Sequence, residues 1–306
     1  MTYQRTLSKK VSVTGRGLHS GKLVTLTLHP AVANAGISFK RVDLKDQPPI
    51  KASFENVSAT ENATTIGTGI NVVHTIEHLL GVLYGLGINN LFCEIDGPEV
   101  PIMDGSGGSF AFLLKETGIV SLNASRNFIV ITEPIRVEVD DKWVQIEPDP
   151  MLVIESTIVF AHPKIKTQSR KFRFSCEDFI TDICRARTFG FLKDVDMLKR
   201  KGLIKGGSLD NAIILDEFNV VNPEGVRFSD EFIRHKILDT IGDISLLGYD
   251  VAGKITSFKS GHHLHNLLCR KIIATPGCYK VISAPNQQES AVVAFALPRS
   301  MSPVAY

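Results

Sequence analysis

Arg234-His235-Lys236-Ile237-Leu238-Asp239, a stretch that continues to Asp243, is the part of this chain around which the rest is expected to fold. Apolar residues recur around it at helical spacing and Asp230 is a suitable N-cap, so the pattern predicts a helix. On that helix His235 and Asp239 lie four residues apart and leave the same face, and Asp243 follows one turn later. These three side chains on one helix face could supply two metal ligands and a carboxylate that orients another side chain. Taken alone, the pattern is more typical of a solvated His–Asp pair, and two other stretches of the chain are what favour the metal site.

The composition excludes several classes of protein. The chain has 306 residues, which favours two domains, with 43% hydrophobic and 22% charged residues, as in ordinary globular proteins. A formal net charge of +2 with scattered basic residues gives no basis for nucleic-acid binding. The N-terminus has no apolar signal core, and the longest apolar run, 291–297, is too short to span a bilayer. Five cysteines without C-x-x-C spacing disfavour a disulfide framework and fit a reducing cytoplasm. Nothing in the sequence implies an oligomer.

The order of patterns along the chain predicts two domains, 1–124 and 125–306. Two strands are expected in 11–30, a polar insert near 37–70, and a helix from Asn71 that ends at Gly85 and Gly87. The strand-rich stretch 128–160 resembles residues 11–30 loosely, which hints at a duplicated βα unit. A second insert, of helix–turn–strand type, is expected near 194–222, and a last strand at 291–297.

A second candidate site lies far upstream, at Glu77 and His78 within an otherwise apolar helical pattern. Charged side chains beside Leu79 are out of place unless they serve a function. A metal-bound histidine with an adjacent glutamate that takes a proton from water is typical of zinc hydrolases. His74 completes an H-x-x-E-H string, which is the inverzincin pattern and leaves a metalloprotease using His74, Glu77 and His78 as an alternative.

A third stretch, Ser260-Gly261-His262, places a histidine at an expected strand–helix junction. Catalytic zinc has three protein ligands and an open position, and His78, His235 and Asp239 would supply those ligands. Asp243 would then hold His262 charged, although a solvated residue at a helix start is the plainer reading of His262 alone. A non-enzymatic carbohydrate- or nucleotide-binding module with structural histidines also remains open.

Six motifs taken together resemble one family, the UDP-3-O-acyl-N-acetylglucosamine deacetylases. These are zinc enzymes that catalyse the committed step of lipid A biosynthesis in Gram-negative bacteria, and the resemblance runs almost end to end. The motifs are Gly15-Arg16-Gly17-Leu18-His19-Ser20-Gly21, Thr75-Ile76-Glu77-His78-Leu79, Pro101-Ile102-Met103-Asp104-Gly105-Ser106, Ala186-Arg187-Thr188-Phe189-Gly190-Phe191, Arg234-His235-Lys236-Ile237-Leu238-Asp239 with Ile241-Gly242-Asp243, and Lys259-Ser260-Gly261-His262.

The resemblance implies a role for each matched residue in hydrolysis of an N-acetyl group. One zinc ion would be held by His78, His235 and Asp239. Four residues would carry the chemistry: Glu77 as general base, His262 as the acid that protonates the leaving amine, Asp243 as its orienting partner, and Thr188 as a group that polarises the amide oxygen.

The resemblance also implies substrate contacts and a fold. UDP-3-O-acyl-N-acetylglucosamine would contact Lys236, Lys259, Phe189 and, more loosely, Phe160, and Leu203 of the second insert would line an acyl-chain passage. The fold would be α+β, with two similar α/β sandwich domains, a small insert in each, and the active site between them. Two features depart from the family: His263 and His265 are additional histidines, and His74 is not a ligand position.

Overall fold

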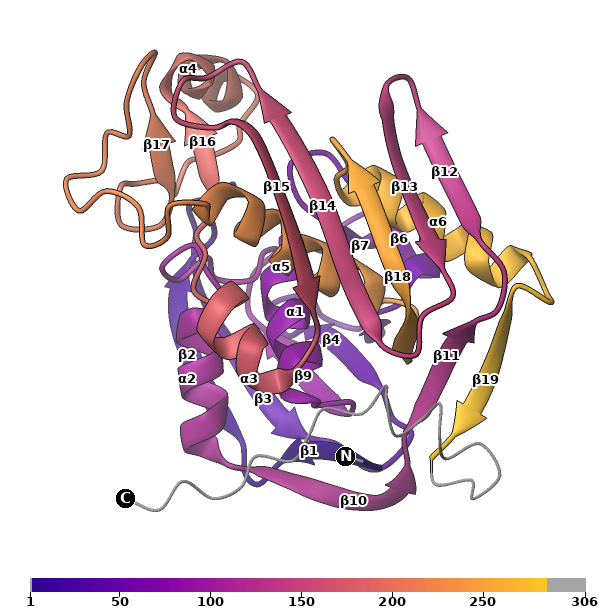
Figure 1. Ribbon diagram of the computed structural model, residues 1–306. Coiled ribbons are helices and arrows are strands. Elements are labelled where there is room, and N and C mark those ends of the chain that lie inside the picture. Colours follow the sequence, from indigo (N-terminus) through magenta and orange to yellow (C-terminus); the bar gives the residue numbers. More distant parts are fainter. Residues whose placement is uncertain (1, 285–306) are drawn as a thin grey trace, which may run out of the picture.

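The computed structural model describes residues 2–284, and the expected strand at 291–297 lies outside that range. The protein is a mixed α/β structure with two main sheets (Figure 1). The first sheet has five strands in the order β2-β3-β9-β4-β5. Its strands are β2 (Val11–Arg16), β3 (Leu23–Pro30), β4 (Ile37–Arg41), β5 (Ile50–Lys51) and β9 (Leu91–Ile95).

The second main sheet has seven strands, in the order β12-β13-β18-β11-β19, with β14 pairing β18 and β15 pairing β14. Its strands alternate apolar with polar side chains where one face is buried, as in β14 and β18. They are β11 (Asn127–Ile131), β12 (Ile135–Val139), β13 (Lys142–Glu147), β14 (Leu152–Phe160), β15 (Lys166–Arg173), β18 (Asp250–Phe258) and β19 (Tyr279–Ser283).

The two main sheets share one topology. Each begins with an antiparallel hairpin, β2-β3 or β12-β13, whose second strand pairs antiparallel with β9 or β18. That strand pairs in parallel with β4 or β14, which in turn pairs antiparallel with β5 or β15. The two series are β2-β3-β9-β4-β5 and β12-β13-β18-β14-β15. A helix also precedes and follows the last strand in both series: α1 (Glu77–Leu86) and α2 (Gly108–Thr117) flank β9, and α5 (Glu231–Ser245) and α6 (His262–Ala274) flank β18.

Three small sheets lie outside this repeated arrangement. The segment 37–70 supplies β4 and β5 to the first sheet before it forms β6 (Val57–Ala59) and β7 (Thr65–Thr68), which pair with β8 (Asn71–Val73). Near the second expected insert, β16 (Phe189–Phe191) and β17 (Ile213–Leu215) run parallel, with α4 (Leu192–Arg200) between them in the chain. The last pair joins β1 (Tyr3–Leu7) to β10 (Ile119–Ser125).

Helices α1 and α5 pack against each other at the centre of the molecule (Figure 1). The contact is close because both helices carry a glycine there. A Cβ on Gly242 of α5 would lie 2.1 Å from the Glu77 carbonyl oxygen, and one on Gly81 of α1 would lie 2.9 Å from the Leu238 side chain. One continuous apolar core contains residues of both helices and both main sheets, including Leu26, Leu79, Leu238 and Ile255. The packing therefore fixes the first turn of α1 against the middle of α5.

One local prediction is wrong, for a backbone reason. The helix expected from Asn71 begins only at Glu77, because 71–73 pair with β7 and Thr75 has a left-handed φ of 59°. Asp230 is the N-cap residue of α5, as expected, but its side chain makes no cap bond, since its carboxylate binds Arg234 and Arg170 instead. The strands at 11–30 and the end of α1 at Gly87, with φ 69°, are confirmed.

No helix within residues 2–284 is long and apolar enough to cross a membrane. The five cysteines are all buried and unpaired.

Candidate metal centre and active site

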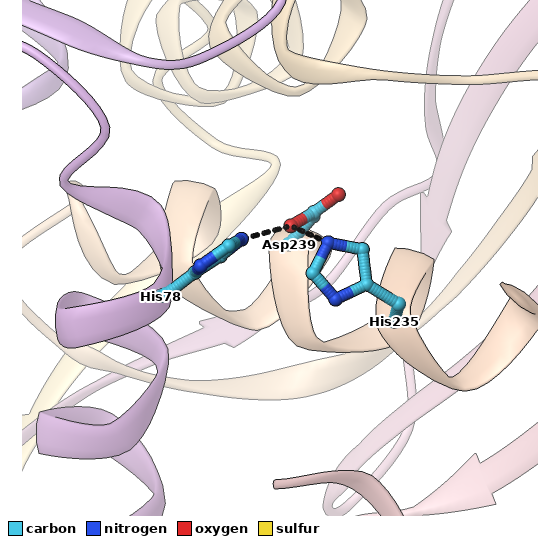
Figure 2. Close-up of side chains that lie close together, drawn as sticks. All are labelled: His78, His235 and Asp239. Carbon is cyan, nitrogen blue, oxygen red and sulfur yellow. Dashed lines mark ion pairs between the residues drawn. The ribbon is translucent and has the colours of Figure 1, made fainter. Parts of the chain in front are cut away.

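Three side chains from α1 and α5 converge on one point (Figure 2). His78 lies in the first turn of α1, and His235 and Asp239 lie one turn apart on α5. The Nε2 atoms of His78 and His235 are 3.6 and 3.4 Å from Oδ1 of Asp239. All three side chains are buried. The glycine contact between the helices brings together residues more than 150 positions apart in the sequence.

The donor atoms of this cluster have free lone pairs, as the ligands of a divalent cation must. Oδ1 of Asp239 is buried without a hydrogen-bond partner, while Oδ2 accepts a bond from Lys236 Nζ at 2.9 Å. Nδ1 of His235 donates to the Ala186 carbonyl at 3.0 Å, which leaves the Nε2 lone pair facing Asp239. Two imidazole nitrogens and one carboxylate oxygen are a donor set that suits zinc.

Burial and charge also favour a bound cation. Burial lowers the pKa of His235 to about 3, so its imidazole is neutral. Burial would raise the pKa of the Asp239 carboxyl, but the Lys236 ammonium, which donates to Oδ2, holds it well below its usual range. An anionic carboxylate beside a neutral imidazole is ready to coordinate a metal without losing a proton.

Glu77 lies next to the cluster at the start of α1. Its Oε2 accepts a hydrogen bond from the Thr64 backbone N–H at 3.0 Å, and the residue is buried. Burial raises the pKa of the Glu77 carboxyl, opposed by the charge of His262 and His78. A carboxylate with a raised pKa beside a candidate metal can accept and release a proton in the range where enzymes work.

His262, the first residue of α6, is held by Asp243 of α5. Its Nδ1 lies 2.8 Å from Asp243 Oδ2. Burial would lower the pKa of His262, but the Asp243 carboxylate raises it to about 9, so the ring is protonated near neutral pH. The hydroxyl of Thr64 donates to Asp243 Oδ1 at 2.6 Å. Thr64 thus links Glu77 to Asp243. The sequence offers no reason to expect this link, because Thr64 lies in a polar loop.

His265 is a second imidazole on the same carboxylate. Its Nδ1 lies 2.7 Å from Asp243 Oδ2, the oxygen that also binds His262. The sequence marks His265 only as an extra histidine, three residues after His262 and so on the same face of α6.

Three of the expected substrate contacts line one cavity of about 320 Å³, formed by Phe160, Lys236 and Lys259 with residues of β13 and β14. Phe189 joins them from β16: its ring centroid is 5.5 Å from that of Phe160 and 5.7 Å from Lys236 Nζ. Phe189 also lies 6.5 Å from the His235 ring, so this aromatic group adjoins the candidate metal centre.

Thr188 and Leu203 are the remaining predicted residues. Thr188 follows Ala186 by two residues, and its backbone N–H donates to the Gly105 carbonyl at 2.8 Å. Leu203 is partly exposed in the turn after α4, where its N–H donates to the Leu198 carbonyl at 2.9 Å.

His74 does not join the metal cluster. It precedes α1, and its Nδ1 lies 2.8 Å from the Thr65 hydroxyl. Because His74 is outside the helix that carries His78, the two do not present a helical H-x-x-E-H pair. Of the two candidate metal groups within residues 2–284, one contains His78 and neither contains His74; the second consists of Asp243, His262 and His265. The expectation of a protease-like site with both histidines as ligands is therefore wrong.

Comparisons with known proteins agree with one another. A family model described as UDP-3-O-acyl N-acetylglycosamine deacetylase matches residues 4–274. A protein of Thioalkalivibrio sulfidiphilus is 45% identical over 300 residues, which cover 97% of this chain and 99% of the relative. A protein of Geobacter sp. (strain M21) is 46% identical, with 97% and 98% covered. One of Myxococcus xanthus is 49% identical, with 93% and 91% covered. All three carry the name UDP-3-O-acyl-N-acetylglucosamine deacetylase.

Proposed function

Since this chain belongs to the UDP-3-O-acyl-N-acetylglucosamine deacetylase family, we propose that it hydrolyses the N-acetyl group of that substrate with one zinc ion held by His78, His235 and Asp239. The reaction is a step of lipid A biosynthesis. The observation that carries the metal assignment is the buried Oδ1 of Asp239, which faces two Nε2 atoms and has no hydrogen-bond partner. A buried carboxylate oxygen left unpaired is unfavourable unless a cation occupies the site.

The residues around the metal divide the proton transfers between them. Zinc, when bound, supplies Lewis acidity to the amide carbonyl and to the attacking water. Glu77 accepts a proton as water attacks, which suits a buried carboxylate of raised pKa. His262, protonated through Asp243, delivers a proton to the leaving amine. Two groups are needed because one proton is removed before the C–N bond breaks and another is delivered as it breaks. Thr188 would help hold the developing oxyanion.

The substrate would extend from the metal along two directions. The cavity lined by Phe160, Lys236 and Lys259 places two lysines beside an aromatic ring, which suits the nucleotide diphosphate end, although Lys236 is paired with Asp239 and Lys259 with Asp141. Phe189 lies between this cavity and the His235 ring, and so would contact the sugar. Leu203, in the turn after α4, would contact the acyl chain.

The shared topology of the two sheets supports two duplicated domains with a boundary near residue 124. Neither main sheet contains strands from both sides of that boundary, and the site residues come from α1 on one side and α5 and α6 on the other. A cytoplasmic location completes the proposal, supported by five buried unpaired cysteines.

The test is release of acetate from UDP-3-O-acyl-N-acetylglucosamine by the purified protein, with metal content measured on the same sample. We expect about one zinc per chain and activity that a chelator removes and zinc restores. Activity that survives complete removal of metal would rule out the proposal.

A further inference from the structure

Asp243 holds two histidines with a single oxygen atom. Nδ1 of His262 and Nδ1 of His265 lie 2.8 and 2.7 Å from Oδ2, and the other oxygen accepts the Thr64 hydroxyl at 2.6 Å. A carboxylate oxygen has two lone pairs, so both rings donate to it and both carry a proton on Nδ1. His265 and Asp243 are 1% and 3% exposed, so water does not compete for these bonds.

The far side of His265 is also enclosed. Its Nε2 lies 3.1 Å from Ser260 Oγ and 3.4 Å from Thr240 Oγ1. Thr240 already donates its hydroxyl hydrogen to the Lys236 carbonyl at 2.8 Å, so the Ser260 hydroxyl is the group that can donate to Nε2. These contacts fix the plane of the His265 ring, and the ring in turn fixes the direction of the Asp243 carboxylate.

We propose that His265 is a positioning residue for the acid of the reaction: it shares Asp243 Oδ2 with His262 and so sets both the orientation and the effective basicity of that carboxylate. The inference rests on the deacetylase function proposed above. His265 does not touch the metal cluster, and its effect reaches the substrate only through Asp243 and His262.

The sign of the effect follows from the shared oxygen. A hydrogen bond from His265 stabilises the negative charge of Asp243 and so weakens the stabilisation that this carboxylate gives to the protonated His262 ring. The charged groups that face His262 are Asp243 and Asp239 of α5 and Glu77 of α1, all of which favour its protonated form. Removal of the His265 donor therefore lets Asp243 stabilise the His262 imidazolium more strongly, and His262 releases its Nε2 proton to the leaving amine less readily.

The kinetic test compares two substitutions in the zinc-loaded enzyme. His265→Ala should lower kcat roughly ten-fold with KM little changed, and should move the basic limb of the pH–rate profile upward by roughly one pH unit. His265→Asn keeps an N–H at a similar place and should restore most of both. His263→Asn, at the exposed neighbour on α6, is the matched control and should change neither.

A structural role alone would lower stability or kcat without moving the limb, and that result would overturn the inference. Should His265→Ala fail to fold, the nitrogen-15 NMR spectrum of the wild-type enzyme decides instead. Both Nδ1 atoms should carry a proton, and a His265 protonated only on Nε2 would refute the shared-oxygen arrangement. Failure of the deacetylase proposal can be told apart, because the wild-type enzyme itself would then release no acetate.

Discussion

Gly242→Ala tests whether the packing of α1 on α5 builds the active site. An alanine Cβ there would lie 2.1 Å from the Glu77 carbonyl oxygen and 2.8 Å from its carbonyl carbon. These are backbone atoms that cannot rotate away, so the helices must separate by roughly 1 Å. Overpacking of this kind costs about 1–3 kcal/mol, offset by about 1 kcal/mol of better helix propensity. We expect a net loss of up to about 2 kcal/mol and a fall in Tm of up to a few °C.

The functional loss should exceed the loss of stability. Glu77 and His78 begin the helix that moves, whereas His235 and Asp239 remain on α5. A displacement of about 1 Å between catalytic groups can lower the rate roughly 100-fold. The assay is kcat/KM for deacetylation at a temperature where circular dichroism shows the variant to be folded, together with its zinc content.

Gly108→Ala is the matched control, because its Cβ would meet only the Ser106 hydroxyl at 3.2 Å and side-chain and Cα atoms of Arg185 beyond that. We expect it to behave like the wild type. A folded Gly242→Ala variant with wild-type Tm and wild-type kcat/KM would refute the claim that this contact positions the site.

Three further predictions concern the metal, the pH profile and the acyl chain. Asp239→Ala should lose zinc while His74→Ala keeps it, measured by metal analysis after dialysis; the reverse result would restore the protease-like ligand set. The rate should be bell-shaped in pH: activity falls on the acid side as Glu77 is protonated, at a pH above the ordinary carboxyl range because burial raises its pKa, and falls on the basic side as His262 loses its proton near pH 9. His262→Ala should abolish that basic limb, and an unchanged profile contradicts its role as acid. UDP-N-acetylglucosamine without the acyl chain should be a poor substrate, since six buried methylenes contribute roughly 5 kcal/mol. Leu203→Asp should slow only the acylated substrate, and equal efficiency on both substrates would remove the acyl passage.

Helix periodicity was sufficient to predict α5 and the pairing of His235 with Asp239, because residues four apart on a helix must share a face whatever surrounds them. The same reasoning misplaced the start of α1. Val72 and Val73 are apolar and fit a helical stripe, but their backbone pairs with β7, and the left-handed Thr75 separates that strand from the helix. Apolar spacing does not distinguish a short buried strand from a helical turn when tertiary pairing decides between them.

The sequence by itself determined the chemistry available to this protein: which residues can bind a metal, which can transfer protons, and through six ordered motifs, which family they resemble. Only the tertiary structure decided which of these groups meet. Gly81 and Gly242 bring His78 to Asp239, and Thr64 links Glu77 with Asp243 from a loop that carries no motif. Asp243 receives two histidines because both lie on one face of α6 where it crosses α5. Such contacts join residues far apart in the chain, and their geometry depends on helix packing, which local spacing does not encode.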